Sequence, residues 1–227
     1  VAQKFISNVV AQAERMAGLN IDKMLVSISG TQSHSNIIDD YIRVHDIVKA
    51  SDIDNLANKV RQKFKQNNRE VIHLIPIEYR IDDSLPVVNP RYMSGNKLYT
   101  KFHVVSVSST TINNIEHCLK NCQLSVQGYI CEPYSSALSC LSQNEMRLGS
   151  LVLNMGFNAT SVAVILDGKF IKVGNLPIGG FHITKDISTI FNISLGLAEQ
   201  IKNLNSSLFI SPIEEKEMIK MKLTSVS

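Results

Sequence analysis

The sequence predicts an α/β protein in which a small α+β subdomain is inserted between two other segments. Apolar residues recur at helical spacing in some stretches and at every second position in others, so helices and strands alternate along the chain. Between about residues 37 and 124 the order becomes strand, helix, strand, strand, helix. That order is typical of a compact α+β unit rather than of a repeated βα arrangement.

The first segment of the chain is predicted to hold one helix and one strand. The helix has a broad apolar stripe of period 3.6, formed by Phe5, Ile6, Val9, Val10, Ala13, Met16 and Ala17. Gly18 ends it, and a short strand follows at Met24–Ile28, before Ser29-Gly30. Because the helix begins at residue 1 without a capping residue, we expect the chain to be truncated there.

The inserted subdomain is predicted to contain three strands and two helices. They are a short strand near Ile42–Val44, a helix capped by Ser51 with Asp54 at the capping-box position, strands at Val71–Ile81 and Leu98–Val107, and a helix over residues 112–122. Residues 83–96 contain two prolines and a glycine and are predicted to form a loop.

The segment after the subdomain is predicted to be mostly strands followed by helices. The predicted elements are a strand at Val126–Ile130, a helix from Pro133 through Ser142, strands at Leu151–Leu153, Ser161–Leu166 and Lys169–Val173, and helices at His182–Phe191 and Leu197–Leu204. Asp167-Gly168 is a strong hairpin signal between the last two strands. The tail from Ser211 gives no prediction.

The composition excludes several classes of protein. Hydrophobic residues make up 44% of the chain, which indicates a folded globular protein. The 23 basic and 20 acidic residues are scattered, without the basic stripe that nucleic acid binding requires. No run of about 18 apolar residues and no signal-peptide pattern occurs, so we expect a protein that is neither exported nor membrane-spanning.

The four cysteines, Cys118, Cys122, Cys131 and Cys140, contain no CxxC pair and do not predict a metal site. Cys122 continues a helical series of apolar residues, so we expect a small buried side chain there. Reduced thiols are expected throughout.

The remaining polar residues do not form a catalytic pattern. His73 lies on the apolar face of its strand and is expected to be a hydrogen-bonded core residue. The adjacent pairs Asp39-Asp40 and Asp82-Asp83 do not present two carboxylates to one substrate, because neighbours on a strand point to opposite faces. Both pairs are interpreted as turn residues. No histidine, serine and aspartate set indicates a nucleophile.

Several short motifs occur in a fixed order along the chain: Ala13-Glu14-Arg15-Met16-Ala17-Gly18, Val26-Ser27-Ile28-Ser29-Gly30, His73-Leu74-Ile75-Pro76-Ile77-Glu78-Tyr79-Arg80-Ile81-Asp82, Asn89-Pro90-Arg91-Tyr92-Met93-Ser94-Gly95, the Cys118–Leu124 helix end, Glu132-Pro133, Leu176-Pro177-Ile178-Gly179-Gly180 and Ala198-Glu199-Gln200-Ile201-Lys202. Their order and spacing resemble the family of the bacterial cell-division protein FtsA from residue 1 to about residue 205. The stretch 26–30 is the most telling of the first three segments.

The resemblance implies an α/β fold with an actin-like (ribonuclease H-like) core that is incomplete at both ends. The implied domains are the first part of one core subdomain (1–30), the inserted α+β subdomain (31–124), the second part of that core subdomain (125–149), a second core subdomain (150–204) and an unassigned tail (205–227). By comparison with the family we expect a first phosphate loop, most of the second subdomain and a membrane-targeting amphipathic helix to be missing.

The resemblance also implies ATP and magnesium as cofactors. The family pattern at the second phosphate hairpin is Asp, an apolar residue, three glycines and Thr, but residues 154–160 read Asn-Met-Gly-Phe-Asn-Ala-Thr. Asn154 lacks the negative charge that favours a divalent cation, and Phe157 places a ring where backbone should approach phosphate. We expect binding to be weak or lost. The alternative is an ordinary strand-turn-strand with a strained Gly156.

Other residues at the implied nucleotide site have equally good structural interpretations. Glu199 and Lys202 share a helix face that approaches adenosine in the family, or they form a solvated ion pair. Gly179 and Gly180 precede a helix whose N-terminus could face an anion, or they only shape a turn. Glu132 lies where the family brings a polar side chain to the cleft, or it is a carboxylate at a helix start.

The resemblance implies a non-enzymatic, cytoplasmic division scaffold at the inner face of the cell membrane, at the septum. Its implied partners are FtsZ, whose ring it helps to assemble and attach to the membrane, and later division proteins. Self-association would use the inserted subdomain, and peripheral membrane contact would need the expected missing segment. The alternatives are another actin-like ATPase, of the chaperone or sugar-kinase type, and a degenerate gene fragment without activity.

Overall fold

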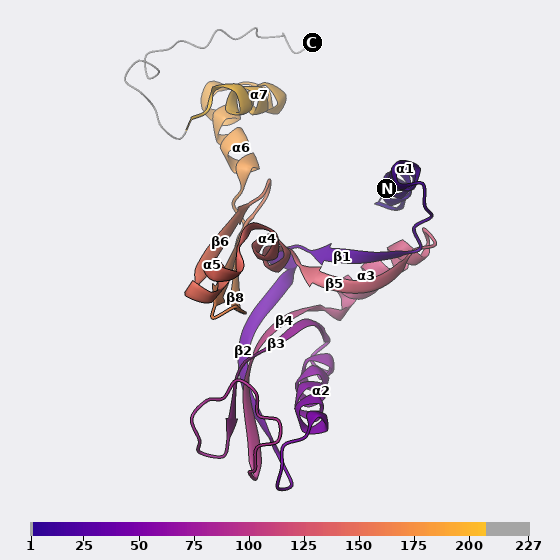
Figure 1. The fold of residues 1–227 in the computed structure, drawn as a ribbon. Coiled ribbons are helices and arrows are strands. Elements are labelled where there is room, and N and C mark those ends of the chain that lie inside the picture. Colours follow the sequence, from indigo (N-terminus) through magenta and orange to yellow (C-terminus); the bar gives the residue numbers. More distant parts are fainter. Residues whose placement is uncertain (1, 208–227) are drawn as a thin grey trace. The chain divides into compact units, whose positions relative to one another are not determined.

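The computed structural model describes residues 2–207 of the chain (Figure 1). These residues form two compact units. Unit 1 contains residues 2–154 and 161–175, and unit 2 contains residues 155–160 and 176–207. The boundaries proposed from the sequence near residues 30, 124 and 150 stay predictions. The tail from Ser211 lies outside the described residues.

In chain order the elements are α1 (Ala2–Ala17), β1 (Lys23–Ile28), the 3₁₀ turn η1 (Gly30–Gln32), β2 (Ser33–Arg43), α2 (Ala50–Gln66), β3 (Arg69–Ile81), β4 (Lys97–Ser108), α3 (Ser109–Lys120), β5 (Ser125–Cys131), α4 (Glu132–Cys140), α5 (Gln143–Leu148), β6 (Ser150–Met155), β7 (Thr160–Leu166), β8 (Lys169–Leu176), α6 (Gly180–Phe191) and α7 (Leu195–Asn205).

Unit 1 begins with the predicted helix and strand, and both are confirmed. Gly18, with a φ of 67°, ends α1 in the left-handed conformation that glycine adopts without steric cost. β1 pairs with β5 in parallel, and this pair forms a sheet of its own. β5 follows β4 and α3 in the chain, so residues 33–108, which form a separate layer, lie between the two paired strands in the sequence.

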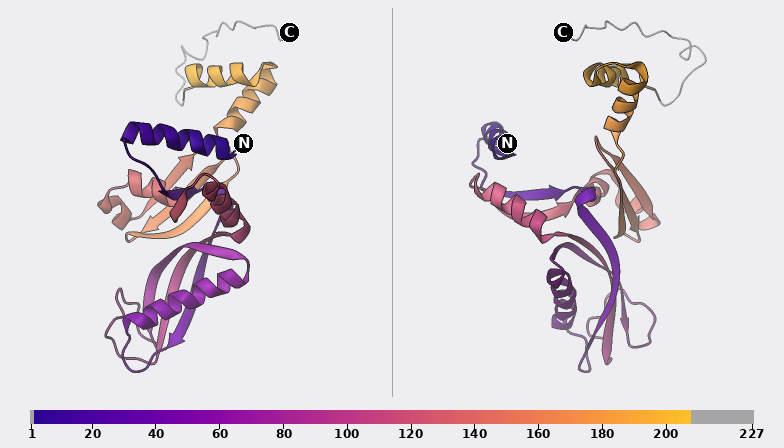
Figure 2. Two further views of the ribbon diagram at one scale, coloured as in Figure 1. Left: turned by 90° about the vertical axis from the view of Figure 1, so that its right-hand side faces the viewer. Right: turned by 180° about the vertical axis from the view of Figure 1, so that it is seen from behind.

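That separate layer is a three-stranded antiparallel sheet of order β2-β4-β3. α2 lies along one face of it, as Figure 2 shows. The core between helix and sheet is closely packed, and its most buried members are Val48, Leu56, Val60, Leu98, Phe102 and Val104. The predicted α+β order is therefore observed, and none of these strands pairs with β1 or β5 in a common sheet.

The prediction for β2 was wrong in its length. A short strand was expected near Ile42–Val44, whereas β2 begins at Ser33 and runs for 11 residues. The interpretation of Asp39-Asp40 as turn residues was wrong for the same reason, because both lie inside this strand. Serine, asparagine and aspartate disfavour strands on average, and pairing along the whole of β4 overrides that preference here. Asp82, with a φ of 46°, is a turn residue as expected.

Three smaller differences concern helix ends. α2 begins at Ala50, and the Lys49 N–H donates to the Asp52 carboxylate at 2.8 Å, so Ser51 and Asp54 do not cap it. Cys122 is not a core residue: α3 ends at Lys120, and Cys122 lies partly exposed in the turn that follows. α5 was not expected, although Ser142 and Glu145 form a capping box that is readable in the sequence.

The third sheet has the order β6-β7-β8, and the predicted Asp167-Gly168 hairpin is confirmed, with φ values of 51° and 71°. A second core joins the strands of this hairpin to one end of the inserted sheet. Its buried members are Val105, Cys131, Ala137, Ala163, Ile165, Phe170 and Val173.

Two histidines, one half-buried and one fully buried, lie beside this second core. The Cys131 N–H donates to His73 Nε2 at 2.9 Å, which confirms the hydrogen-bonded core role predicted for His73. His103 is fully buried on β4, and its Nε2 lies 2.8 Å from Ser35 Oγ on β2. Its ring meets that of Phe170 edge to face, with centroids 5.0 Å apart. Both histidines thus link the inserted sheet to β5 and β8.

Candidate functional site

Within unit 1, the end of β6 faces the start of α4. Asn154 Nδ2 donates to Glu132 Oε1 at 2.7 Å and to Ser136 Oγ at 3.4 Å. Glu132 is in the first turn of α4, where a carboxylate interacts favourably with the helix dipole. The structure therefore brings Asn154 and Glu132 together, as a hydrogen-bonded pair.

This pair does not suit a divalent cation. A magnesium site uses carboxylate oxygens, and an aspartate at position 154 would place a second carboxylate beside Glu132. Asn154 instead presents its amide hydrogens to that carboxylate and so takes the place of a positive charge. The residues present do not fit magnesium at this point.

In unit 2, residues 156–159 form a closed turn, in which the Gly156 N–H donates to the Ala159 carbonyl at 2.9 Å. The expectation of a strained Gly156 was wrong, because the positive-φ glycines of the described chain are Gly18, Gly149 and Gly168. A Cβ at Gly156 would lie 3.0 Å from the Ala159 oxygen, so close approach favours glycine there. Phe157 packs against Phe181, with ring centroids 5.0 Å apart.

The start of α6 is held against this turn by backbone contacts. The N–H groups of Gly180 and Phe181 donate to the carbonyls of Gly156 and Phe157 at 3.0 and 2.8 Å. A Cβ on Gly179 would lie 2.4, 2.6 and 2.7 Å from backbone atoms of Gly156, Phe157 and Ala159. Only glycine fits at position 179.

These contacts decide how the N-terminus of α6 can be used. A helix N-terminus binds anions through N–H groups that lack partners within the helix. Here the first two are bonded to the turn, and the Gly179 N–H donates to His182 Nδ1 at 3.1 Å. The arrangement favours a structural turn over a phosphate site.

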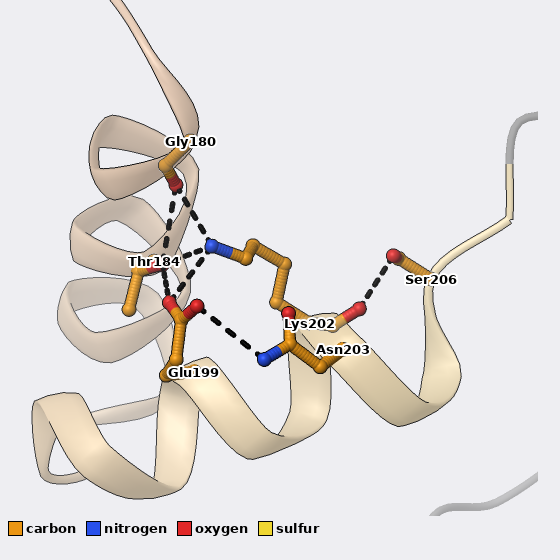
Figure 3. A network of polar contacts seen from close by, with 6 residues as sticks. All are labelled: Gly180, Thr184, Glu199, Lys202, Asn203 and Ser206. Carbon is orange, nitrogen blue, oxygen red and sulfur yellow. Dashed lines mark hydrogen bonds and ion pairs between the residues drawn. The ribbon is translucent and has the colours of Figure 1, made fainter. Parts of the chain in front are cut away.

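Glu199 and Lys202 lie on α7 and contact Gly180 and Thr184 on α6, as Figure 3 shows. Lys202 Nζ donates to Glu199 Oε2 at 2.8 Å, to Thr184 Oγ1 at 2.9 Å and to the Gly180 carbonyl at 3.2 Å. Thr184 also bonds to Glu199. The Lys202 side chain is 16% exposed and the Glu199 side chain 37%, so the lysine is half-buried while the carboxylate stays open to solvent.

The network affects the charge of its carboxylate. Hydrogen bonds from Lys202 and Thr184 hold the pKa of Glu199 below its ordinary value. Glu199 therefore stays ionised at neutral pH and keeps the Lys202 ammonium beside Gly180. A role in contacting adenosine stays a prediction.

Comparison with known proteins identifies the family. The model for the "SHS2 domain inserted in FTSA" matches residues 27–106, and the model for "Cell division protein FtsA" matches residues 151–227. Together they match more than half of the chain. The chain belongs to the FtsA family. The FtsA inserted domain corresponds to the separate β2-β4-β3 sheet with α2.

Curated FtsA relatives agree with this assignment. The FtsA of Agrobacterium fabrum is 31% identical over 92% of this chain, and that of Pseudomonas aeruginosa is 30% identical over 87%. The chain covers 48% of each, so it spans about half the length of the curated relatives that it matches.

A solved structure of a PilM-PilN type IV pilus biogenesis complex matches 89% of the chain and 55% of its own, with a TM-score of 0.64 and 15% identity. This likeness concerns the fold alone. The fold is α/β and actin-like, with an inserted α+β subdomain.

Two residues that contact the candidate site residues were missed from the sequence. Thr184 joins Glu199 to Lys202, and Ser136 is the second partner of Asn154. Thr184 follows Gly180 by one helical turn, and Ser136 follows Glu132 by the same spacing, so helical periodicity places each beside a predicted residue. Nothing in the sequence shows which partners they meet.

No group of three or more histidine, cysteine, aspartate or glutamate side chains that could hold a metal ion occurs among residues 2–207. In the same range, no helix is both long enough and apolar enough to cross a membrane.

Proposed function

We propose that this chain is part of a cell-division scaffold of the FtsA type, which helps to assemble the FtsZ ring and to attach it to the membrane at the septum. The inserted subdomain is the part that contacts partners or further copies of the scaffold. On this proposal the protein acts by binding, on the cytoplasmic face of the membrane, and catalysis is not its role.

One observation carries the proposal. The FtsA-specific insert model and the FtsA model match in order within one chain, and the insert coincides with a sheet that has its own packed core. An actin-like chaperone or sugar kinase would need an acidic, glycine-rich hairpin at 154–160, whereas this chain has the Asn154–Glu132 pair.

A chimeric scaffold tests the proposal. Residues 31–124 of this chain replace the matching region of the full-length Agrobacterium fabrum FtsA, tagged with a fluorescent protein. We expect the chimera to collect at the division site and to support ring assembly, because the module folds around its own core. A deletion variant that lacks the region should lose most of its septal fluorescence.

Both tagged proteins are first shown by thermal unfolding to contain a folded core. A chimera that folds and yet behaves like the deletion variant would contradict the assignment of partner contacts to this subdomain. It would favour a degenerate fragment.

We further infer that magnesium and ATP bind weakly or not at all. Support comes from the Asn154 amide on Glu132 and from the bonded N–H groups at the start of α6. No chemical step is assigned to either cofactor here.

Asn154→Asp tests this inference. At neutral pH without divalent cations the variant should unfold more easily by about 1–2 kcal/mol, because two part-buried carboxylates would replace a hydrogen-bonded pair. Millimolar Mg²⁺ should restore much of the loss in the variant and leave the parent chain unchanged. Urea unfolding with and without Mg²⁺ and ATP measures both effects.

Asn158→Asp is the matched control, since residue 158 is exposed in the turn. It should change stability little and gain nothing specific from Mg²⁺. A parent chain that Mg²⁺ and ATP stabilise strongly would contradict the inference.

A further inference from the structure

β2 is the outer strand of the inserted sheet, and among residues 2–207 no strand pairs with its other edge along its 11 residues. Such an edge presents unpaired N–H and C=O groups and can template pairing with another chain. Ile37 and Tyr41 are 52% and 45% exposed, which adds apolar area to the strand. The protein needs some means of keeping this edge unpaired.

The register shows which backbone groups face outward. Arg43 pairs with Lys97, whose carbonyl accepts from the Asp82 N–H on the far side of β4. In contrast, the N–H of Val44 points toward the β4 side and donates to the Asn96 carbonyl. Because direction alternates along a strand, the outward groups of β2 belong to the odd-numbered residues, Tyr41 among them.

Side chains occupy both outward groups of Tyr41. Its N–H donates to Asp40 Oδ1 at 2.8 Å. Its carbonyl accepts from Lys59 Nζ at 2.8 Å, and the same ammonium donates to Asp40 Oδ1 at 2.7 Å. One ion pair therefore satisfies the two backbone groups that an added strand would use.

Lys59 also lies across the edge. It extends from α2, on one face of the sheet, and its ammonium lies 5.2 Å from the ring centroid of Tyr41, whose side chain belongs to the other face. Lys63, one turn further along α2, donates to Asp40 Oδ2 at 2.7 Å. Lys63 steadies the carboxylate without touching the backbone of β2.

Burial alone would raise the pKa of Asp40, but hydrogen bonds from Lys59 and Lys63 outweigh it and hold the pKa below its ordinary value. The carboxylate therefore stays charged, and both ion pairs persist, at neutral pH.

The opposite edge of the sheet, formed by β3, is covered by a loop residue near the same position along the strands. β3 has register shifts near His73 and Glu78. The Val87 N–H donates to the Tyr79 carbonyl at 2.8 Å, and the Tyr79 N–H donates to the Val87 carbonyl at 3.3 Å. The loop residue Val87 thus satisfies the backbone groups of Tyr79 on β3, as the ion pair satisfies those of Tyr41 on β2.

We propose that Lys59 and Asp40 close the free edge of β2 against strand addition, so that a second copy of this chain cannot pair with it. The device is independent of the division role proposed above. Self-association of the inserted subdomain, where it occurs, uses a surface other than the middle of this edge.

The test uses the full chain with Lys59→Met, and with Lys63→Met as the matched control. Both remove one partly exposed lysine that pairs with Asp40, but only Lys59 covers the Tyr41 backbone. In Lys59→Met we expect the Tyr41 amide to exchange with solvent at least about tenfold faster and sedimentation to show larger species at high concentration. Lys63→Met should match the parent chain in both measurements.

A further variant separates edge pairing from other association. Lys59→Met combined with Ile37→Lys places a charge on the opened strand and should return the protein to the parent sedimentation profile. The proposal is overturned if Lys59→Met and Lys63→Met behave alike. It is also overturned if Lys59→Met exchanges faster without associating, or if the added charge does not reverse the association.

Discussion

Gly179→Ala is expected to unfold the start of α6 while unit 1 stays folded. The added methyl group would lie 2.4, 2.6 and 2.7 Å from three backbone atoms of the 156–159 turn. Backbone atoms cannot rotate away as the end of a flexible side chain can. We expect a loss of at least about 3 kcal/mol in the stability of unit 2, at the upper end of the cost of overpacking.

Amide hydrogen exchange is the measurement of choice, because two units need not unfold in one transition. Protection of α6 and α7 should fall sharply in Gly179→Ala, and protection of β3 and β4 in unit 1 should persist.

Gly180→Ala is the matched control for this prediction. A Cβ there would meet Lys202 Nζ at 3.6 Å, an ordinary contact, and alanine is a better helix former than glycine. We expect stability to be unchanged or to rise by up to about 1 kcal/mol. Equal losses in the two variants would show that the contact with the turn is not what requires glycine at 179.

The second large effect is acid destabilisation through His103. Burial lowers the pKa of His103 to about 4; the backbone of Phe170 acts in the opposite direction, and His73 lowers the pKa further. Among the described residues its Nδ1 has no hydrogen-bond partner, and the ring is fully buried. The fold therefore holds the neutral form of this side chain.

The pH dependence follows from proton binding in the two states. In the unfolded chain the histidine has a pKa near 6.5, so between pH 6.5 and about 4 the unfolded state binds a proton that the folded state does not. The contribution of neutral His103 to the free energy of unfolding is fully present above pH 6.5 and is lost as the pH falls to about 4. The expected contribution of His103 is about 3 kcal/mol. Burial also lowers the pKa of His73, which acts in the same direction.

His103→Gln should remove most of this dependence, because glutamine can still bond to Ser35 but does not titrate. Urea unfolding at pH 4.5 and 7 should show a smaller difference for the variant than for the parent chain. The same substitution at the exposed His34 on β2 should leave the difference unchanged. If His103→Gln kept the parent's full acid sensitivity, the titrating group would lie elsewhere.

Local patterns in the sequence were enough to predict most elements of the fold. β3 and β4 are rich in apolar and β-branched residues, α1 and α2 have clear apolar faces, and Asp167-Gly168 marks its hairpin, so each is found where expected. β2 was underestimated because its polar residues gain their stability from pairing with β4 and, at Asp40, from two lysines on α2. Those partners are distant in the sequence and leave no local signal.

At the candidate site, too, some features could be predicted from the local sequence and others could not. The substitution of Asn154 and Phe157 into the hairpin could be read directly, and it predicted weakened cofactor binding. The bond from Asn154 to Glu132, the fit of Gly179 against the turn and the place of Thr184 between Glu199 and Lys202 depend on packing between separate elements. Periodicity can place a residue on one face of a helix or strand, but it does not identify the residue that it contacts on a neighbouring element.

The contacts of Gly180 give unit 2 a mechanical property. Its N–H is bonded to the turn at Gly156, and its carbonyl is bonded to Lys202 on α7. Gly180 thus contacts both the turn and α7, while Phe181 and Thr184 on α6 add a second bond to each. A ligand that displaced the Lys202 ammonium would therefore also disturb the turn, so we expect the turn, α6 and α7 to move together.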